Sequence, residues 1–122
     1  MKAALFAVAA LVAICAAPAQ AQEAQQDFTL VNDTGYDIKE VYVSPNKSNN
    51  WEEDILGDDQ LIDGHETHIH FSRANKTCNW DLKVVYSEDD SDAVWKEINL
   101  CKVTKITLKY DRKKDVTSAY FD

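Results

Sequence analysis

The segment Trp80-Asp-Leu-Lys-Val-Val-Tyr86 has the clearest strand pattern in the chain. Its apolar residues recur at every second position, with the charged residues Asp81 and Lys83 between them. Successive side chains of a strand point to opposite faces of a sheet, so this period of two indicates a strand with one buried face. We therefore expect an inward stripe formed by Trp80, Leu82, Val84 and Tyr86.

Segments on both sides of this strand show the same alternation at regular spacing. We expect further strands at residues 28–32, 38–43, 67–71, 94–100, 105–110 and 116–121. Turn-forming residues such as Asn32-Asp-Thr-Gly35 and Asp63-Gly64 separate them. Six to seven short strands with almost no helix favour an all-β fold, an antiparallel β-sandwich or small barrel.

The first 21 residues predict a signal peptide rather than part of the fold. Lys2 precedes an apolar run over residues 3–17, and Ala19-Gln-Ala21 has the A-x-A form of a cleavage site. The apolar run is too short to span a membrane. We expect cleavage after Ala21, a single β domain over residues 22–122, and a periplasmic protein with no membrane partner.

The cysteine count changes once the signal peptide is removed. Cleavage would remove Cys15 and leave Cys78 and Cys101. An even pair in an oxidising compartment predicts a disulfide, whereas a two-thiolate metal site would be expected to show C-x-x-C spacing. A lipid anchor on Cys15 is the alternative interpretation of this segment, but Ile14 stands where such a signal needs a small residue.

The expected mature chain is strongly acidic. The full sequence has 13 Lys and Arg and 21 Asp and Glu, and residues 1–21 hold one of the basic residues and none of the acidic ones. The mature net charge is then −9, from 12 basic and 21 acidic residues. Such a surface repels nucleic acid and anionic membranes and attracts cations or basic partners. Nucleic-acid binding is therefore excluded.

Acidic residues are densest in the segment SPNKSNNWEEDILGDDQLIDG, residues 44–64, which we call the acidic loop. It is the only long segment without strand periodicity. We expect one short helical turn there, after the second strand, with Asn50 as its N-cap and Trp51, Ile55 and Leu56 turned inward. Within eight residues it holds five carboxylates, those of Glu52, Glu53, Asp54, Asp58 and Asp59.

This density of like charges predicts a metal site. Crowded carboxylates cost stability unless a cation neutralises them. No EF-hand register fits, but hard oxygen ligands suit Ca²⁺ or a lanthanide, and four or five anionic ligands favour the trivalent ion. If the strands form a simple meander, the second acidic turn (residues 87–92) shares an end with the acidic loop and adds reserve ligands. The expected metal ligands are Glu52, Glu53, Asp54, Asp58, Asp59, Asp89 and Asp90.

Such a loop can present only about four ligating side chains, whereas hard cations of this size take about six to eight oxygen atoms. Water, a small anion or carboxylates of a second molecule would fill the remaining positions. The last of these predicts a metal-dependent homodimer, and the alternative is a monomer whose bound ion keeps its waters. The alternative function is a metal-independent protein-interaction module, in which the acidic pole binds a basic periplasmic partner. A solvated acidic surface without a ligand is the simplest explanation of the same residues.

Histidines offer a competing metal site. His68 and His70 alternate on one strand and so share a face, with His65 or Glu66 as a third ligand. An exposed strand face with polar residues explains the same pattern.

Tryptophans at Trp51, Trp80 and Trp95 suggest a sugar platform, but Trp80 belongs to the inward stripe. No catalytic constellation is visible, so we expect a protein that is not an enzyme.

Several motifs resemble those of a known group of proteins. They are Phe28-Thr-Leu30, Asn32-Asp-Thr-Gly35, Val41-Tyr-Val-Ser-Pro45, Trp51-x-x-Asp54-x-Leu56-Gly57, Leu61-x-x-Gly64, Cys78-x-Trp80-Asp-Leu82 and Leu100-Cys101. Together they resemble small exported bacterial β-proteins, one branch of which is the periplasmic lanthanide-binding proteins that accompany lanmodulin. Sequences of this kind often have Gly where this chain has Glu52. The resemblance implies that Glu52 is particular to this protein and that Trp51 and Asp54 are framework residues.

Overall fold

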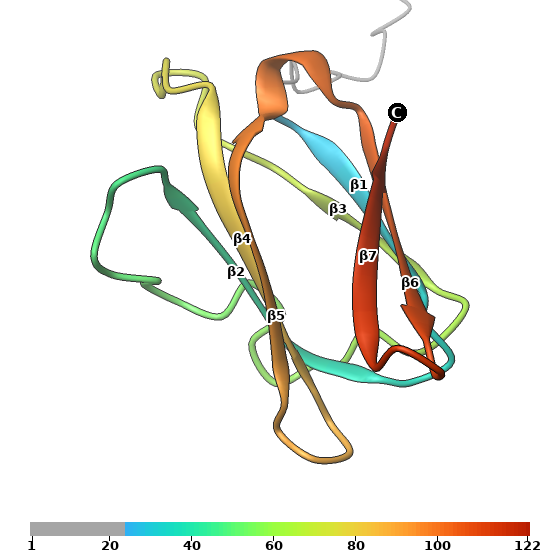
Figure 1. Cartoon of the computed structure of the whole chain (residues 1–122). Helices are drawn as coiled ribbons and strands as arrows, with labels where there is room; N and C mark the ends of the chain where they lie inside the picture. The colour runs from blue at the N-terminus through green and yellow to red at the C-terminus, as the bar shows by residue number, and fades with distance from the viewer. Residues whose placement is uncertain (1–23) are drawn as a thin grey trace, which may run out of the picture.

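The computed structural model describes residues 24–122, and the predicted signal peptide lies outside this range. The strands form two facing sheets that do not close into a barrel, so the predicted all-β sandwich is confirmed (Figure 1). The elements are β1 (Phe28–Asp33), β2 (Ile38–Pro45), β3 (Glu66–Ile69), β4 (Asn79–Tyr86), β5 (Asp92–Asn99), the 3₁₀ helix η1 (Leu100–Lys102), β6 (Lys105–Asp111) and β7 (Val116–Phe121).

The order of the strands differs from the expected meander. One sheet has the order β3-β1-β6-β7, and the other has the order β2-β4-β5. β1 runs parallel to β6, whereas every other pair of neighbouring strands is antiparallel. The chain therefore crosses between the two sheets after β1, after β2, after β3 and after η1, and only β4–β5 and β6–β7 are hairpins.

A buried asparagine fixes the first crossing. Asn32 at the end of β1 is fully buried, and its Nδ2 donates to the backbone oxygens of Tyr36 and Leu61 at 2.7 and 2.8 Å. Its Oδ1 accepts from the backbone N–H and the hydroxyl of Thr34. Because a buried polar group must be hydrogen-bonded, these partners hold the 34–37 connection in a crossover rather than a hairpin.

The core lies between the two sheets. It contains the predicted stripe of Trp80, Leu82, Val84 and Tyr86, each at most 7% exposed. A bulge in β2 between Ile38 and Glu40 shifts the alternation, so that Ile38 and Val41 both point into the core. The other core residues are Phe28, Leu30, Leu61, Ile69, Ile98, Leu100, Ile106 and Leu108.

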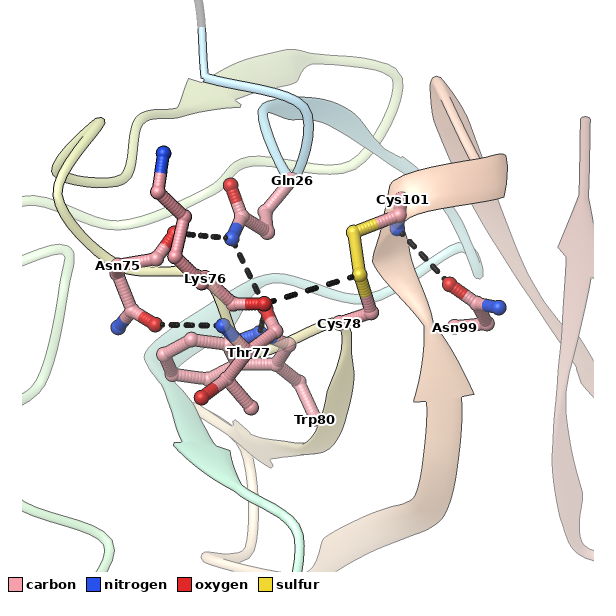
Figure 2. The surroundings of a disulfide bond; sticks show 8 residues. All are labelled: Gln26, Asn75, Lys76, Thr77, Cys78, Trp80, Asn99 and Cys101. Atoms are coloured by element: carbon pink, nitrogen blue, oxygen red, sulfur yellow. Dashed lines mark hydrogen bonds between the residues drawn. A yellow bond between two sulfur atoms is a disulfide. The ribbon is translucent and has the colours of Figure 1, made fainter.

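The predicted disulfide between Cys78 and Cys101 is present. It joins the start of β4 to η1, with 5.2 Å between the two Cα atoms. The neighbouring 75–78 segment is held by Gln26, whose buried amide donates to the backbone oxygens of Asn75 and Thr77 at 2.7 and 2.9 Å (Figure 2). Trp80 Nε1 also donates to the Thr77 oxygen. The disulfide thus fixes the point where the chain passes from β5 toward β6.

The helical turn expected at Asn50 does not form as a helix, because η1 is the only helical element of residues 24–122. Backbone hydrogen bonds instead close turns between Asp54 and Gly57 and between Leu56 and Asp59. Leu56 packs against the core as expected, whereas Ile55 is 41% exposed.

No helix within the described part of the chain is long and apolar enough to cross a membrane.

Candidate functional site

The acidic loop covers the free edge of β2. It leaves the end of β2 and turns back along this strand, as the green segment of Figure 1 shows. Ile55 N–H donates to the Val41 oxygen at 2.8 Å, and Leu61 and Ile38 exchange backbone hydrogen bonds of 2.8 and 3.0 Å. The loop therefore satisfies edge groups that would otherwise be open to pairing with another chain.

Asp54, a predicted metal ligand, is part of this edge cover. Its Oδ1 accepts hydrogen bonds from the backbone N–H groups of Val41 and Leu56, at 2.8 and 3.0 Å. The carboxylate replaces the backbone oxygen that a neighbouring strand would offer to Val41. Its second oxygen, Oδ2, makes no hydrogen bond with any part of residues 24–122. Of the two carboxylate oxygens of Asp54, only Oδ2 is therefore free of hydrogen bonds within the described chain.

Glu52 and Glu53 point their charge to solvent. Both residues are exposed, and neither makes a side-chain hydrogen bond or ion pair within the described chain. Glu52 has a backbone φ of 62°, the left-handed region that favours glycine. A glycine at this position would adopt this conformation without strain. Glu52 is therefore held at an energetic cost.

An open hollow of about 580 Å³ lies beside these residues, between the acidic loop and the 69–72 segment. We call it the loop hollow. Its lining includes three successive acidic residues of the loop and the aromatic residues Phe71 and Trp80. Its lining comprises Val43, Glu52, Glu53, Asp54, Ile55, Ile69, His70, Phe71, Ser72 and Trp80. Among the predicted ligands, only Glu52, Glu53 and Asp54 meet here.

The other predicted ligands lie elsewhere. Asp59 lines a neighbouring hollow that shares Ile55 with the first, and Asp58 is exposed beside it. Because β2 and β4 are antiparallel, the turn after β4 is at the opposite end from the start of the acidic loop. There Asp90 pairs with Lys39, and Asp89 accepts from Ser91. The expected single acidic pole is therefore wrong for Glu52, Glu53 and Asp54, whereas the end of the loop at Leu61 lies beside Ile38, at the end of β2 that pairs with Tyr86.

No group of three or more His, Cys, Asp or Glu side chains is close enough to hold a metal ion within residues 24–122. The three acidic residues at the loop hollow are therefore not arranged as a closed cage. Of the described ion pairs, Lys39–Asp90, His70–Asp27, Lys83–Asp92 and Lys109–Asp33, none involves the five loop carboxylates. No basic side chain of residues 24–122 pairs with these carboxylates.

Trp51 lies outside the core rather than inside it. Its ring is partly buried, and the Lys83 ammonium lies 5.9 Å from the ring centroid and 5.6 Å from that of Tyr42. Trp51 therefore anchors the start of the acidic loop through a cation–π contact. The indole of Trp51 directly precedes Glu52 in the sequence.

The histidine pair has the predicted common face. The rings of His68 and His70 stack with centroids 6.1 Å apart, and both residues are exposed. Nδ1 of His68 lies 2.8 Å from the Thr29 hydroxyl, and Nδ1 of His70 lies 3.3 Å from Asp27. One nitrogen of each ring is therefore already engaged.

A second hollow, not predicted from the sequence, lies at the end of the sandwich with the β4–β5 turn. It is lined by Tyr36, Tyr86 and Tyr110 together with Glu88, Asp89, Ser91 and Asp115, and its volume is about 210 Å³. We call it the tyrosine pocket. The three rings come from distant parts of the chain, so no local motif marks them. The only sequence signal is that tyrosines end the β4 and β6 stripes.

Comparison of the chain with protein-family models, with curated proteins and with solved structures gives no match.

Proposed function

We propose that the protein is a periplasmic binding protein for a hard metal cation, a lanthanide ahead of Ca²⁺, and that it takes part in metal handling. The proposed ligands are the carboxylates of Glu52 and Glu53 with the free oxygen of Asp54. Asp59 is a neighbouring donor from the adjoining hollow. Carboxylate oxygens are the ligands that such ions prefer. The disulfide is compatible with the oxidising compartment that this role requires.

One observation carries this proposal: Glu52, whose backbone is left-handed and whose carboxylate has no partner in residues 24–122, lines the same hollow as Glu53 and Asp54. A non-glycine residue in this region costs on the order of 1 kcal/mol. Strained positions of this kind are concentrated at binding sites. Asp54 Oδ1 is occupied by two backbone N–H groups, so the fold holds this carboxylate in place and leaves one oxygen for a cation.

The ligand set of one molecule is incomplete. Two glutamates and one oxygen of Asp54 give five carboxylate oxygens at most, whereas Ca²⁺ takes about six to eight. Carboxylates of a second copy would supply the rest, and a shared trivalent ion would remove the repulsion between two acidic surfaces. The proposal therefore includes a metal-bridged dimer with a small isologous contact.

Terbium luminescence tests the site. Trp51 adjoins Glu52, so excitation of tryptophan should sensitise bound Tb³⁺. The double substitution Glu52→Gln/Glu53→Gln should abolish this emission. The control Asp89→Asn/Asp90→Asn removes the same charge from the β4–β5 turn and should preserve the emission. Equal loss in both variants would indicate general charge attraction and would contradict a site at the loop.

Sedimentation velocity tests the bridge. At tens of micromolar protein, half an equivalent of La³⁺ should produce a dimer, and excess metal should return it to monomers. A sedimentation coefficient that stays monomeric throughout the titration would leave metal binding intact and remove the bridge from the proposal.

The unpaired loop carboxylates also support a second candidate, a metal-independent interaction module for a basic partner. The two functions respond differently to salt and to chelators. Binding of a basic partner should weaken steeply with salt and should not respond to a chelator. Tb³⁺ emission that is insensitive to the loop substitutions, together with salt-sensitive binding of a basic protein, would favour this candidate.

A further inference from the structure

The tyrosine pocket shares no lining residue with the loop hollow, so it is a separate feature of the surface. Its aromatic rings belong to Tyr36 in the β1–β2 connection, Tyr86 at the end of β4 and Tyr110 in β6. Tyr86 is 7% exposed, whereas Tyr36 and Tyr110 are partly exposed. The ring of Tyr86 is therefore fixed in the core, whereas solvent reaches the rings of Tyr36 and Tyr110.

The three rings pack edge to face around one another. Tyr36 lies 5.4 Å from Tyr110 at an interplanar angle of 85°, and 6.2 Å from Tyr86 at 80°. Tyr86 and Tyr110 lie 6.3 Å apart at 66°. In an edge-to-face pair the edge of one ring covers part of the face of the other. Each face carries partial negative charge, so the parts of the faces left open toward the pocket attract a cation. Such a wall favours a cation.

Two of the three hydroxyl groups are held by the protein. Tyr110 donates to Asp115, and the Tyr86 hydroxyl lies 2.7 Å from that of Thr117. The hydrogen bond to Asp115 raises the pKa of Tyr110 to about 12. With their hydroxyls engaged, these two tyrosines offer a ligand mainly their ring surfaces.

Carboxylates supply the rest of the wall. Glu88, Asp89 and Asp115 line the pocket, and no lysine or arginine does. Asp89 accepts from the Ser91 hydroxyl at 2.6 Å and from its backbone N–H at 3.0 Å. These bonds lower the pKa of Asp89. Its negative charge is therefore retained and oriented.

The tyrosine cluster already binds one cation of the protein itself. The guanidinium of Arg112 lies 5.5 Å from the centroid of the Tyr36 ring. Arg112 is not among the residues that line the pocket, so it does not fill the pocket. The pocket volume of about 210 Å³ is below the roughly 300 to 1,000 Å³ of drug-sized sites and suits a group of a few heavy atoms.

We propose that the tyrosine pocket binds an alkylammonium group, held by the faces of Tyr36, Tyr86 and Tyr110 and by the charges of Glu88, Asp89 and Asp115. Aromatic faces favour a soft organic cation over a hard metal ion, which would need more oxygen ligands. The carboxylates exclude anions. Aromatic walls with an acidic rim are the arrangement by which proteins recognise quaternary and methylated ammonium ions.

Calorimetric titration at constant ionic strength tests this assignment. Choline chloride should bind with saturation, and 3,3-dimethyl-1-butanol, the neutral isostere of choline, should bind at least about tenfold more weakly. In a second titration, N-acetyl-lysine amide replaces choline as the ligand. If this amide binds and choline does not, the ammonium group is a lysine side chain of a partner; if neither binds, or if the neutral isostere equals choline, the assignment fails.

Substitutions of Tyr110, whose ring is partly exposed, test whether the ammonium group binds in this pocket. Tyr110→Phe keeps the ring and should retain choline binding, whereas Tyr110→Leu should reduce it about tenfold or more. Equal loss in both variants would overturn a role for the ring face. If Tyr110→Leu does not fold, NMR shifts of the tyrosine ring protons on titration of the wild-type protein provide the same test. Shifts confined to other residues would overturn the proposal.

Discussion

The carboxylate of Asp54 accepts a hydrogen bond from the backbone N–H of Val41 at 2.8 Å and thereby takes the place of a neighbouring strand. The same oxygen accepts from Leu56 N–H at 3.0 Å, which holds the turn of the acidic loop. Val41 is fully buried, so its N–H has no alternative partner in water. A residue that the sequence marks as a metal ligand is thus first a component of the fold.

Replacement of Asp54 should destabilise the protein without metal. Asp54→Ala leaves two backbone N–H groups without their acceptor, and hydrogen bonds to a charged group contribute about 1.5 to 3 kcal/mol. We expect the free energy of unfolding in urea to fall by about 2 kcal/mol and the Val41 amide to exchange faster. The exposed control Asp58→Ala should change it by less than about 0.5 kcal/mol. An unchanged unfolding free energy for Asp54→Ala would contradict this assignment.

Replacement of Glu52 by glycine should raise stability and reduce metal affinity. Because φ is 62° at Glu52, glycine relieves strain, and we expect a gain of about 0.5 to 1 kcal/mol in the free energy of unfolding. Glu53 has no positive φ, so the matched control Glu53→Gly should not stabilise. The Tb³⁺ affinity should fall in both variants. A Glu52→Gly protein that is less stable than wild type would refute the strain argument.

Removal of the disulfide should cost a large part of the stability. Cys78 and Cys101 are 23 residues apart, and a loop of this size corresponds to about 3 kcal/mol in the chain-entropy description. The Cys78→Ala/Cys101→Ala variant should therefore melt on the order of 10 °C lower, as measured by circular dichroism. Intact mass should rise by two hydrogens when the wild type is reduced. Two free thiols in freshly purified material would be the contrary result.

The phenol of Tyr110 should ionise at a higher pH than an ordinary tyrosine. Its pKa is raised from 10.0 to about 12 by the hydrogen bond to Asp115. A raised folded-state pKa contributes stability that is present below about pH 10 and is lost as the pH rises through about 12. In an ultraviolet titration of tyrosinate, Asp115→Asn should move one tyrosine toward lower pH. Tyr42, whose pKa is raised to about 12 by Glu40, should stay in place as the internal control. An unshifted curve would disprove the Tyr110–Asp115 bond.

The strands could be predicted because each carries its own periodic signal. The alternation from Trp80 to Tyr86 specifies a half-buried strand without reference to the rest of the chain, and β7 has the predicted bounds Val116–Phe121. The order of the strands has no such local signal. It depends on the side chain of Asn32, whose three hydrogen-bond partners, Thr34, Tyr36 and Leu61, are identified only in the folded protein.

The candidate site was predicted only in part for a similar reason. By residue type alone, a carboxylate that caps a strand edge looks the same as an exposed one, so the charge pattern grouped Asp54 with Glu52 and Glu53. Only the resemblance implied a framework role for Asp54. The tyrosine pocket escaped prediction altogether, since its rings are brought together by the crossing of β1 and β2 and by the parallel pairing of β1 with β6.

This parallel pairing also sets the order in which the protein can fold. β1, the first strand, lies in the middle of its sheet, where Leu30 is paired with Ile106 of β6. A chain that emerges with its N-terminus first therefore holds β1 without its parallel neighbour until the last fifth of the sequence has appeared. Contacts between such distant segments slow folding, because a long chain must close before they form. The four-stranded sheet is consequently completed only after β6 and β7 have emerged, so β1 waits for partners that lie far along the sequence.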